Sequence, residues 1–222
     1  MKASLDKSPP NQSGNKVLSG IYGPYRDNDA LKAIIFAWLI LGIMSAIFPL
    51  ALRQIAPAEV LSDPTHKLTI VLRAVTIAGM ASYIFCLPFY CFWVNRCCKN
   101  AWLLNPPKMR TSPGLAVGYY FIPVISLWKP YVSMCEIRNA SFGMRDQLTT
   151  LLPLWWFAWV AYLLMTAGRI SGGFSSNEEV VSISNKLATV ADITGIALSY
   201  MTIALVISMT NAQKKRASEW RP

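Results

Sequence analysis

The sequence predicts an all-α integral membrane protein: a four-helix bundle with a proline-broken segment, re-entrant or interfacial, between its second and third helices. Three observations lead to this fold class. The chain of 222 residues is 54% hydrophobic and only 14% charged, which is more apolar than a soluble domain of this size. Four apolar segments are long enough to cross a bilayer. Basic residues cluster just outside these segments, as is typical of loops at the cytoplasmic face of a membrane.

The polar ends of the chain frame this membrane domain. Residues 1–29 are rich in Ser, Asn, Pro and Gly and contain no apolar core of the kind that a cleavable signal peptide carries. We expect them to form a disordered cytoplasmic tail. Residues 30–212 then form the membrane domain, and residues 213–222 form a short basic tail on the cytoplasmic side.

Four segments of the membrane domain are predicted transmembrane helices, because about 20 apolar residues at 1.5 Å per residue cross a hydrocarbon core of roughly 30 Å. They are residues 33–52, 68–94, 151–170 and 187–209. The first segment has no charged residue, whereas the second carries Arg73 and the fourth carries Asp192.

The segment 113–135 is apolar, but Pro113, Pro123 and Pro130 interrupt it. A straight helix over residues 113–128 would span only about 24 Å, and the prolines disfavour a straight helix. We expect a half-helix that starts at Pro113 and ends at Pro123. The segment should pack against the bundle, because irregular backbone at membrane depth needs protein or water to satisfy it. Re-entrant, interfacial and spanning placements are compatible with its composition.

The distribution of Lys and Arg separates the two topologies. With four crossings, most of the 21 basic residues fall on one side of the membrane; a fifth crossing through the segment 113–135 divides them almost evenly. The positive-inside rule therefore favours four crossings, with both termini in the cytoplasm.

Enzymatic signatures are absent from the sequence. His66 is the single histidine, so neither a histidine-based metal site nor a Ser-His-Asp triad can be assembled within one chain. Nucleotide-binding glycine motifs are also missing. We therefore expect no enzyme activity, no metal and no cofactor. The net charge of +10 is explained by an anionic membrane surface rather than by nucleic acid.

The middle of the chain carries a recognisable pattern. Residues 93–104 read WVNRCCKNAWLL, and residues 111–141 read TSPGLAVGYYFIPVISLWKPYVSMCEIRNAS. Over residues 95–141 the chain resembles the bacterial membrane proteins grouped as domain-of-unknown-function family 4328. The resemblance implies residence in the bacterial inner membrane and no established activity. Two positions depart from the family pattern: Ser126 stands where Asn is usual, and Arg138 where Trp is usual. The positions that we single out within the resemblance are Arg96, Asn100, Pro113, Gly114, Gly118, Pro123, Pro130, Tyr131 and Glu136.

Trp93, Arg96 and Asn100 follow the spacing i, i+3, i+7, so they share one face if the second helix continues. We expect this face to point toward the proline-broken segment. There, Arg96 and Asn100 would bind an anionic lipid head group or the open backbone of the segment. The alternative is an interfacial tryptophan anchor with a basic flank. We also expect Glu136 to pair with Arg96.

Arg73 and Asp192 form a second candidate pair, because each lies about five residues inside its helix from the outer side, at matching depths near 7 to 8 Å. Ionisable residues at membrane depth usually face a partner or a wet cavity. A salt bridge between the second and fourth helices, an ion or proton pathway, and snorkelling of Arg73 all remain open.

Two classes of function follow. The first is a non-enzymatic scaffold, sensor or partner-binding module that recognises lipid head groups or another protein. The alternative is a small transporter or channel component that uses Arg73, Asp192 and residues 113–131. Expected partners are the lipid bilayer, including anionic lipid head groups, with a homo-oligomer or another membrane protein left open.

Overall fold

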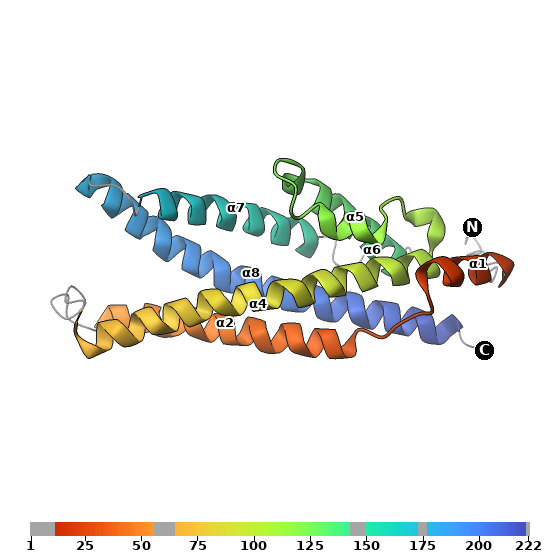
Figure 1. Cartoon of the computed structure of the whole chain (residues 1–222), viewed down its shortest axis with the longest axis horizontal. Coiled ribbons are helices and arrows are strands. Elements are labelled where there is room, and N and C mark those ends of the chain that lie inside the picture. Colours follow the sequence, from red (N-terminus) through yellow and green to blue (C-terminus); the bar gives the residue numbers. More distant parts are fainter. Residues whose placement is uncertain (1–11, 56–64, 143–149, 173–176, 221–222) are drawn as a thin grey trace, which may run out of the picture.

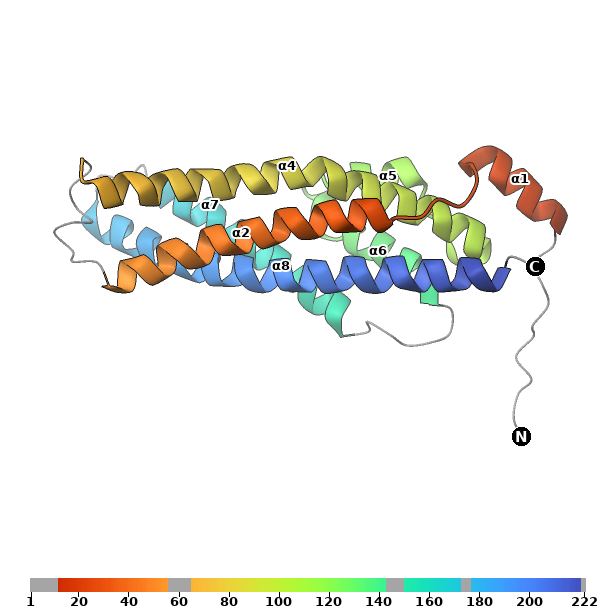
Figure 2. The ribbon, with the colours of Figure 1, turned by 90° about the horizontal axis from the view of Figure 1, so that it is seen from below.

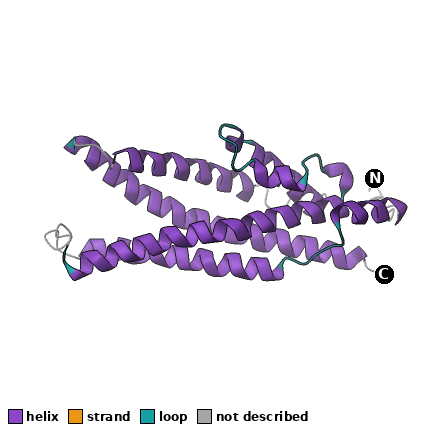
Figure 3. Ribbon diagram, viewed as in Figure 1, coloured by secondary structure: helices purple, strands orange, loops and turns teal. Residues whose placement is uncertain are grey.

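The computed structural model describes residues 12–55, 65–142, 150–172 and 177–220, and every regular element in these ranges is helical (Figure 3). The prediction of an all-α fold is therefore confirmed. The elements are α1 (Gln12–Tyr22), α2 (Asp29–Ile55), α4 (Lys67–Leu104), the 3-10 turn η1 (Pro106–Lys108), α5 (Pro113–Gly118), the 3-10 turn η2 (Ile125–Leu127), α6 (Lys129–Phe142), α7 (Leu151–Gly172) and α8 (Glu178–Trp220).

Four of these helices, α2, α4, α7 and α8, are long and apolar enough to cross a membrane, and they contain the four predicted spans. Two of them run well past the predicted ends. α4 has 38 residues and α8 has 43, so at 1.5 Å per residue each exceeds the roughly 30 Å hydrocarbon thickness by about 25 Å or more. α4 stops at Leu104 because Pro106 and Pro107 follow and cannot continue the helix.

The long helices form two antiparallel hairpins that lie side by side. α2 packs on α4, α7 packs on α8, and α2 also packs on α8, which joins the two pairs. Figure 2 shows α2 running obliquely from beside α4 toward the opposite edge of α8. α1 and the C-terminal end of α8 lie at the same end of the bundle (Figure 1), which we call the terminal end.

The polar tails are more ordered than the sequence indicated. The prediction of a disordered tail over residues 1–29 is wrong for residues 12–28, because α1 forms and the segment 23–28, which we call the strap, is fixed against α4 and α8. Gly23 begins the strap with φ +78, a left-handed conformation that glycine adopts freely and that ends α1. Residues 213–220 are likewise the last turns of α8 and not a separate tail.

The proline-broken segment forms a helical hairpin of α5, a turn and α6 at the terminal end, beside α4 (Figure 1). Its first arm does not extend to Pro123 as predicted. α5 ends at Gly118, and a run of tight turns follows before Pro123. Both arms pack on α4, and α6 also packs on α8, so the hairpin lies against the terminal end of the bundle.

Tight packing is concentrated where the hairpin meets α4 and α8. The side chains of Trp93, Cys97, Met134, Ile137 and Leu205 are fully buried there. Farther along the spans, Ile77, Ile84 and Leu164 are more than 60% exposed, as expected for helix surfaces that face lipid. The terminal end thus has the dense core of a small globular domain attached to a looser bundle.

Candidate functional site

The strap is held across α4 by paired hydrogen bonds to its backbone. Asn100 Nδ2 donates to the carbonyl oxygen of Arg26 at 2.9 Å, and the Arg26 N–H donates back to Asn100 Oδ1 at 3.3 Å. One turn earlier, Arg96 Nη1 donates to the carbonyl oxygen of Asp27 at 3.0 Å. Arg96 and Asn100 thus share a face, as predicted, but that face binds the strap. The prediction that it points toward the proline-broken segment is wrong.

Gln213 joins three helices behind Asn100. Its side chain is 0% exposed, and its Oε1 accepts a hydrogen bond from Asn100 Nδ2 at 3.2 Å. Its Nε2 donates to the carbonyl oxygen of Cys97 in α4 and to Ser141 Oγ in α6, both at 2.9 Å. A buried amide with every contact satisfied fixes the relative positions of α4, α6 and α8.

Two further polar pairs complete this buried cluster. Trp93 Nε1 donates to Thr210 Oγ1 at 3.0 Å, which ties α4 to α8. Asn28, 1% exposed at the end of the strap, donates from Nδ2 to the sulfur of Cys97 at 3.3 Å. Within the described residues its Oδ1 has no hydrogen-bond partner.

Gln213 and Asn28 belong to the buried cluster but were not predicted, and the sequence contained a signal for one of them, Gln213. Leu205, Val206 and Met209 are buried, and Gln213 follows Met209 by four residues on the same helical face. This spacing indicates that α8 continues past residue 209 with its inner face still covered. Asn28 offers no comparable signal, because the strap has no periodicity.

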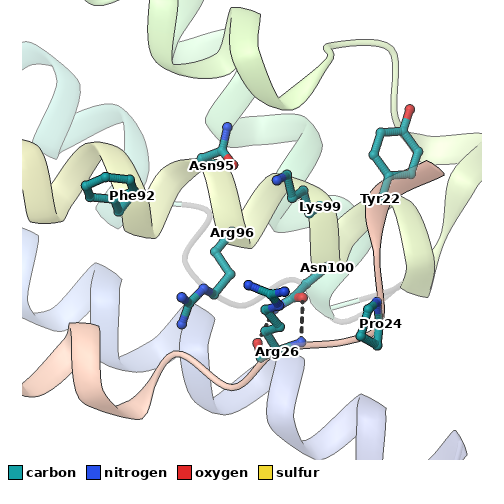
Figure 4. A pocket seen from close by; sticks show the side chains of 8 residues that line it. All are labelled: Tyr22, Pro24, Arg26, Phe92, Asn95, Arg96, Lys99 and Asn100. Atoms are coloured by element: carbon teal, nitrogen blue, oxygen red, sulfur yellow. Dashed lines mark hydrogen bonds between the residues drawn. The ribbon is translucent and has the colours of Figure 1, made fainter. Parts of the chain in front are cut away.

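A cationic pocket of about 330 Å³ lies between the strap and the outer face of α4 (Figure 4). Arg26, Arg96 and Lys99 are among the residues that line it. The pocket is lined by Tyr22, Pro24, Arg26, Phe92, Asn95, Arg96, Lys99 and Asn100. These eight residues include three cations and no carboxylate, so the pocket is suited to an anion.

The acidic residues of this region are engaged on the opposite side of the strap. Lys214 of α8 forms ion pairs with Asp27 and Asp29, and Lys32 pairs with Asp29 at 2.7 Å. The strap therefore presents its carboxylate, Asp27, to α8 and Arg26 to the pocket. Burial, followed by the charge of Asp27, raises the pKa of Tyr25 to about 12, so this phenol stays neutral at physiological pH.

Glu136 has a different role from the predicted ion pair with Arg96. Its Oε2 accepts hydrogen bonds from the backbone N–H groups of Arg110 and Thr111, at 3.0 and 2.8 Å. Arg96 bonds to the strap instead, so the prediction of an Arg96–Glu136 pair is wrong. The physical reason is that the two side chains leave α4 and α6 toward different neighbours.

A second face of α4 binds the start of the hairpin. Asn95 Nδ2 donates to the carbonyl oxygen of Pro113 at 3.1 Å, and Trp102 Nε1 donates to that of Thr111 at 3.0 Å. Together with Glu136, these bonds fix the chain just before α5. Pro113 is buried at the first position of α5, where its missing N–H costs nothing.

Gly114 and Gly118 lie in α5 without a visible packing requirement. A Cβ atom added at either position would meet no atom within 4 Å. The structure explains Pro113 as a helix start, whereas nothing in it explains the two glycines.

The tip of the hairpin is a compact, apolar turn. Val124 has φ +66 and ψ −56, and the N–H of Ile125 donates to the carbonyl oxygen of Pro123 at 2.7 Å. This is a γ-turn with positive φ, which is strained for a β-branched residue. Phe121 and Val124 are about 60% exposed or more, so the tip presents apolar side chains outward.

The second arm of the hairpin is anchored on α7. Pro130 is buried in the first turn of α6, and the ring of Tyr131 lies 6.3 Å from that of Trp156. Trp156 Nε1 donates to the carbonyl oxygen of Leu127 at 3.1 Å. An indole of a neighbouring helix thus satisfies part of the open backbone of the turn.

The candidate pair of Arg73 and Asp192 stays a prediction. The side chain of Arg73 lies outside the described residues, and only its place in α4 is defined. Asp192 is half-buried in α8. In the described part of the chain, no group of three or more His, Cys, Asp or Glu side chains could hold a metal ion.

Four helices are long and apolar enough to cross a membrane, and a buried polar cluster fixes a short hairpin and a strap against them. These features define a helical protein of the membrane-spanning class with a cationic pocket at one end. The model of the domain of unknown function DUF4328 matches residues 60–211, and the chain belongs to this family. The match is broader than the resemblance over residues 95–141. No curated protein and no solved structure matches the chain.

Proposed function

We propose that the protein is a non-enzymatic, multi-pass protein of the bacterial inner membrane that binds an anionic lipid head group in the cationic pocket and senses or scaffolds at that membrane surface. The observation that carries the proposal is that Arg26, Arg96 and Lys99 line one pocket that has no lining carboxylate. Each basic residue near an anionic membrane surface contributes about 1 kcal/mol, so three of them together favour an anionic head group by about 3 kcal/mol.

The level of the pocket favours a lipid over a free phosphate. Phe92, at one edge of the pocket, is 66% exposed, and Phe85 follows two turns deeper on the same face of α4. Cations therefore lie directly beyond an apolar stripe, in the order in which a phospholipid places its phosphate and its chains. A water-soluble phosphate compound has no apolar chains that could contact this stripe.

The terminal end is the cytoplasmic side in this proposal. The hairpin lies at this end together with α1 and the C-terminal ends of α4 and α8. These elements carry the basic residues that the positive-inside rule places in the cytoplasm. An even number of crossings, supported by the hairpin that returns to its own side, puts both termini there.

Binding at the pocket would affect the strap, because Pro24 and Arg26 of the strap line it together with Tyr22 of α1. A bound head group would hold the strap against α4 and would thereby fix α1, whose Tyr22 ring stacks on Trp102 at 5.4 Å. Val17 and Ile21 of α1 are more than 60% exposed and lie one turn apart. This apolar pair is the surface that α1 offers to the membrane or to a protein partner.

The test is lipid binding by the purified protein in non-ionic detergent, measured by native mass spectrometry. Phosphatidylglycerol and phosphatidylethanolamine with identical chains are compared. Loss of one cation costs about 1 kcal/mol, so Lys99→Gln weakens phosphatidylglycerol binding about fivefold, and Lys99→Gln with Arg26→Gln about 25-fold. Lys215→Gln is the matched control: it removes an exposed charge at the same end, outside the pocket.

Equal binding of the two lipids, or equal effects of Lys99→Gln and Lys215→Gln, would contradict the proposal. Glycerol phosphate as a competitor distinguishes the sources of the phosphate group. Full displacement of the lipid at equal concentration would assign the pocket to a soluble phosphate compound.

A further inference from the structure

A second cavity, of about 350 Å³, lies within the predicted spans between α4 and α7. Tyr90 of α4 and Trp159 of α7 face it from the two sides, α8 contributes Leu198, and Leu39 of α2 also lines it. Tyr120 and Phe121 of the hairpin close it at the terminal end. We call this space the aromatic cleft. It differs from the cationic pocket, because Phe92 points about 200° around α4 from Tyr90.

Five polar side chains in the walls of the cleft are hydrogen-bonded within the protein: Tyr90, Tyr120, Trp155, Ser199 and Thr202. The hydroxyl groups of Tyr90 and Tyr120 lie 3.4 Å apart and hydrogen-bond to each other. Trp155 Nε1 donates to Thr202 Oγ1 at 2.9 Å, and Ser199 Oγ donates to the carbonyl oxygen of Gly195 at 2.9 Å. The cleft therefore offers an apolar, aromatic surface to its contents, which disfavours an ion or a sugar.

The mouth of the cleft opens toward the side of the bundle. Leu39 is buried, whereas Leu87 and Leu163, which also line the cleft, are 43% and 40% exposed. Phe121 at the closed end is more exposed still. An occupant therefore enters sideways, from the region where lipid chains lie, and stops below the hairpin.

The size of the cleft decides what enters. An extended hydrocarbon chain is narrower than a helix, which is about 10 Å wide, so the cleft accommodates the chain better than a helix of a second copy or of another protein. A volume of about 350 Å³ falls at the lower end of the range of small-ligand pockets, roughly 300–1,000 Å³. A single linear hydrocarbon chain satisfies both the narrow width and the apolar lining.

We propose that the aromatic cleft binds one acyl chain of a membrane phospholipid, with the hairpin tip as its end wall. Because lipid chains are as apolar as the cleft, close packing against the aromatic rings, and not removal from water, selects the chain. The head group contributes nothing to this selection, since the cleft carries no charged side chain among its lining residues.

The test uses the full chain in nanodiscs with a trace of phospholipid that carries a diazirine in the middle of one acyl chain, followed by peptide mapping after photolysis. Labelling of the cleft lining saturates as the probe is increased, while labelling of open surfaces such as that of Ile84 rises linearly. Phosphatidylglycerol and phosphatidylethanolamine probes label the cleft equally, and Lys99→Gln leaves this labelling unchanged. The outcome is thus separable from that at the cationic pocket.

The decisive variant narrows the mouth. Leu163→Trp overfills the cleft and lowers its saturable labelling about tenfold. Leu164→Trp makes the same change at the next residue, 68% exposed and outside the cleft, and leaves labelling within about twofold of the parent. Leu87→Trp provides a second narrowing variant should Leu163→Trp fold poorly. Linear labelling of the cleft, equal effects of the two α7 variants, or protein–protein cross-links from the cleft in place of lipid labels would overturn the proposal.

Discussion

Asn100 holds the strap on α4, and its replacement by leucine releases the strap while keeping the branched shape and the number of heavy atoms of the side chain. The change removes two hydrogen bonds to the backbone of Arg26 and one to Gln213. Hydrogen bonds contribute about 1 kcal/mol each net, so the strap loses about 2 kcal/mol, or roughly 30-fold in its opening equilibrium. The buried Gln213 oxygen that loses its donor lowers global stability by about a further 1–3 kcal/mol.

Amide hydrogen exchange measured by mass spectrometry separates the two effects. We expect the amide of Arg26, which donates to Asn100 Oδ1, to exchange about 30-fold faster in the Asn100→Leu variant, because opening of the strap controls the exchange of this hydrogen-bonded group. Asn95→Leu is the matched control: the same substitution one turn earlier removes a bond to Pro113 and not to the strap. Unchanged exchange in the strap of a folded Asn100→Leu variant, or equal acceleration by Asn95→Leu, would refute the reasoning.

Three further predictions concern contacts within the bundle and the hairpin. A Cβ atom on Gly79 would lie 2.2 Å from Ser45 Oγ, so Gly79→Ala lowers the melting temperature in detergent and Ser45→Gly in the same chain restores it; no rescue would mean that the helices meet elsewhere. Glu136→Gln weakens two charge-assisted hydrogen bonds and lowers the free energy of unfolding in urea by about 1–3 kcal/mol. Exchanging the charges of Arg96 and Glu136 does not restore this stability, and a recovery would show that the two side chains do pair. Val124→Gly relieves about 1–2 kcal/mol of strain and loses about 0.5–1 kcal/mol to backbone entropy, so it raises the free energy of unfolding. Val124→Ala does not raise it, because alanine keeps a Cβ atom at a positive φ; equal effects of the two variants would argue against the positive φ.

The four long helices could be predicted because apolar length alone identifies a membrane-crossing helix. A broken helical segment between the second and third spans could also be predicted from the sequence, since its prolines disfavour a straight helix. The half-helix boundary at Pro123 was wrong, because tight turns that begin after Gly118 end α5 before the proline is reached.

The site was only partly predictable. Helical spacing correctly put Arg96 and Asn100 on one face, but spacing does not say what a face contacts. Their actual partner, the strap, is separated from them by about 70 residues, and its sequence resembles that of a solvated tail. Gln213 was assigned to a separate basic tail, because polar residues after an apolar span resemble an exposed end. Its burial depends on α6 and α4, which only the tertiary structure brings together.

Direct observation of the cationic pocket in a bilayer tests the central proposal most sharply. A density map of the protein in nanodiscs that contain phosphatidylglycerol should show a phosphate group within about 3 Å of Arg96 and Lys99, with its chains along Phe92. An empty pocket, or a strap displaced from Asn100 in the same preparation, would contradict the account.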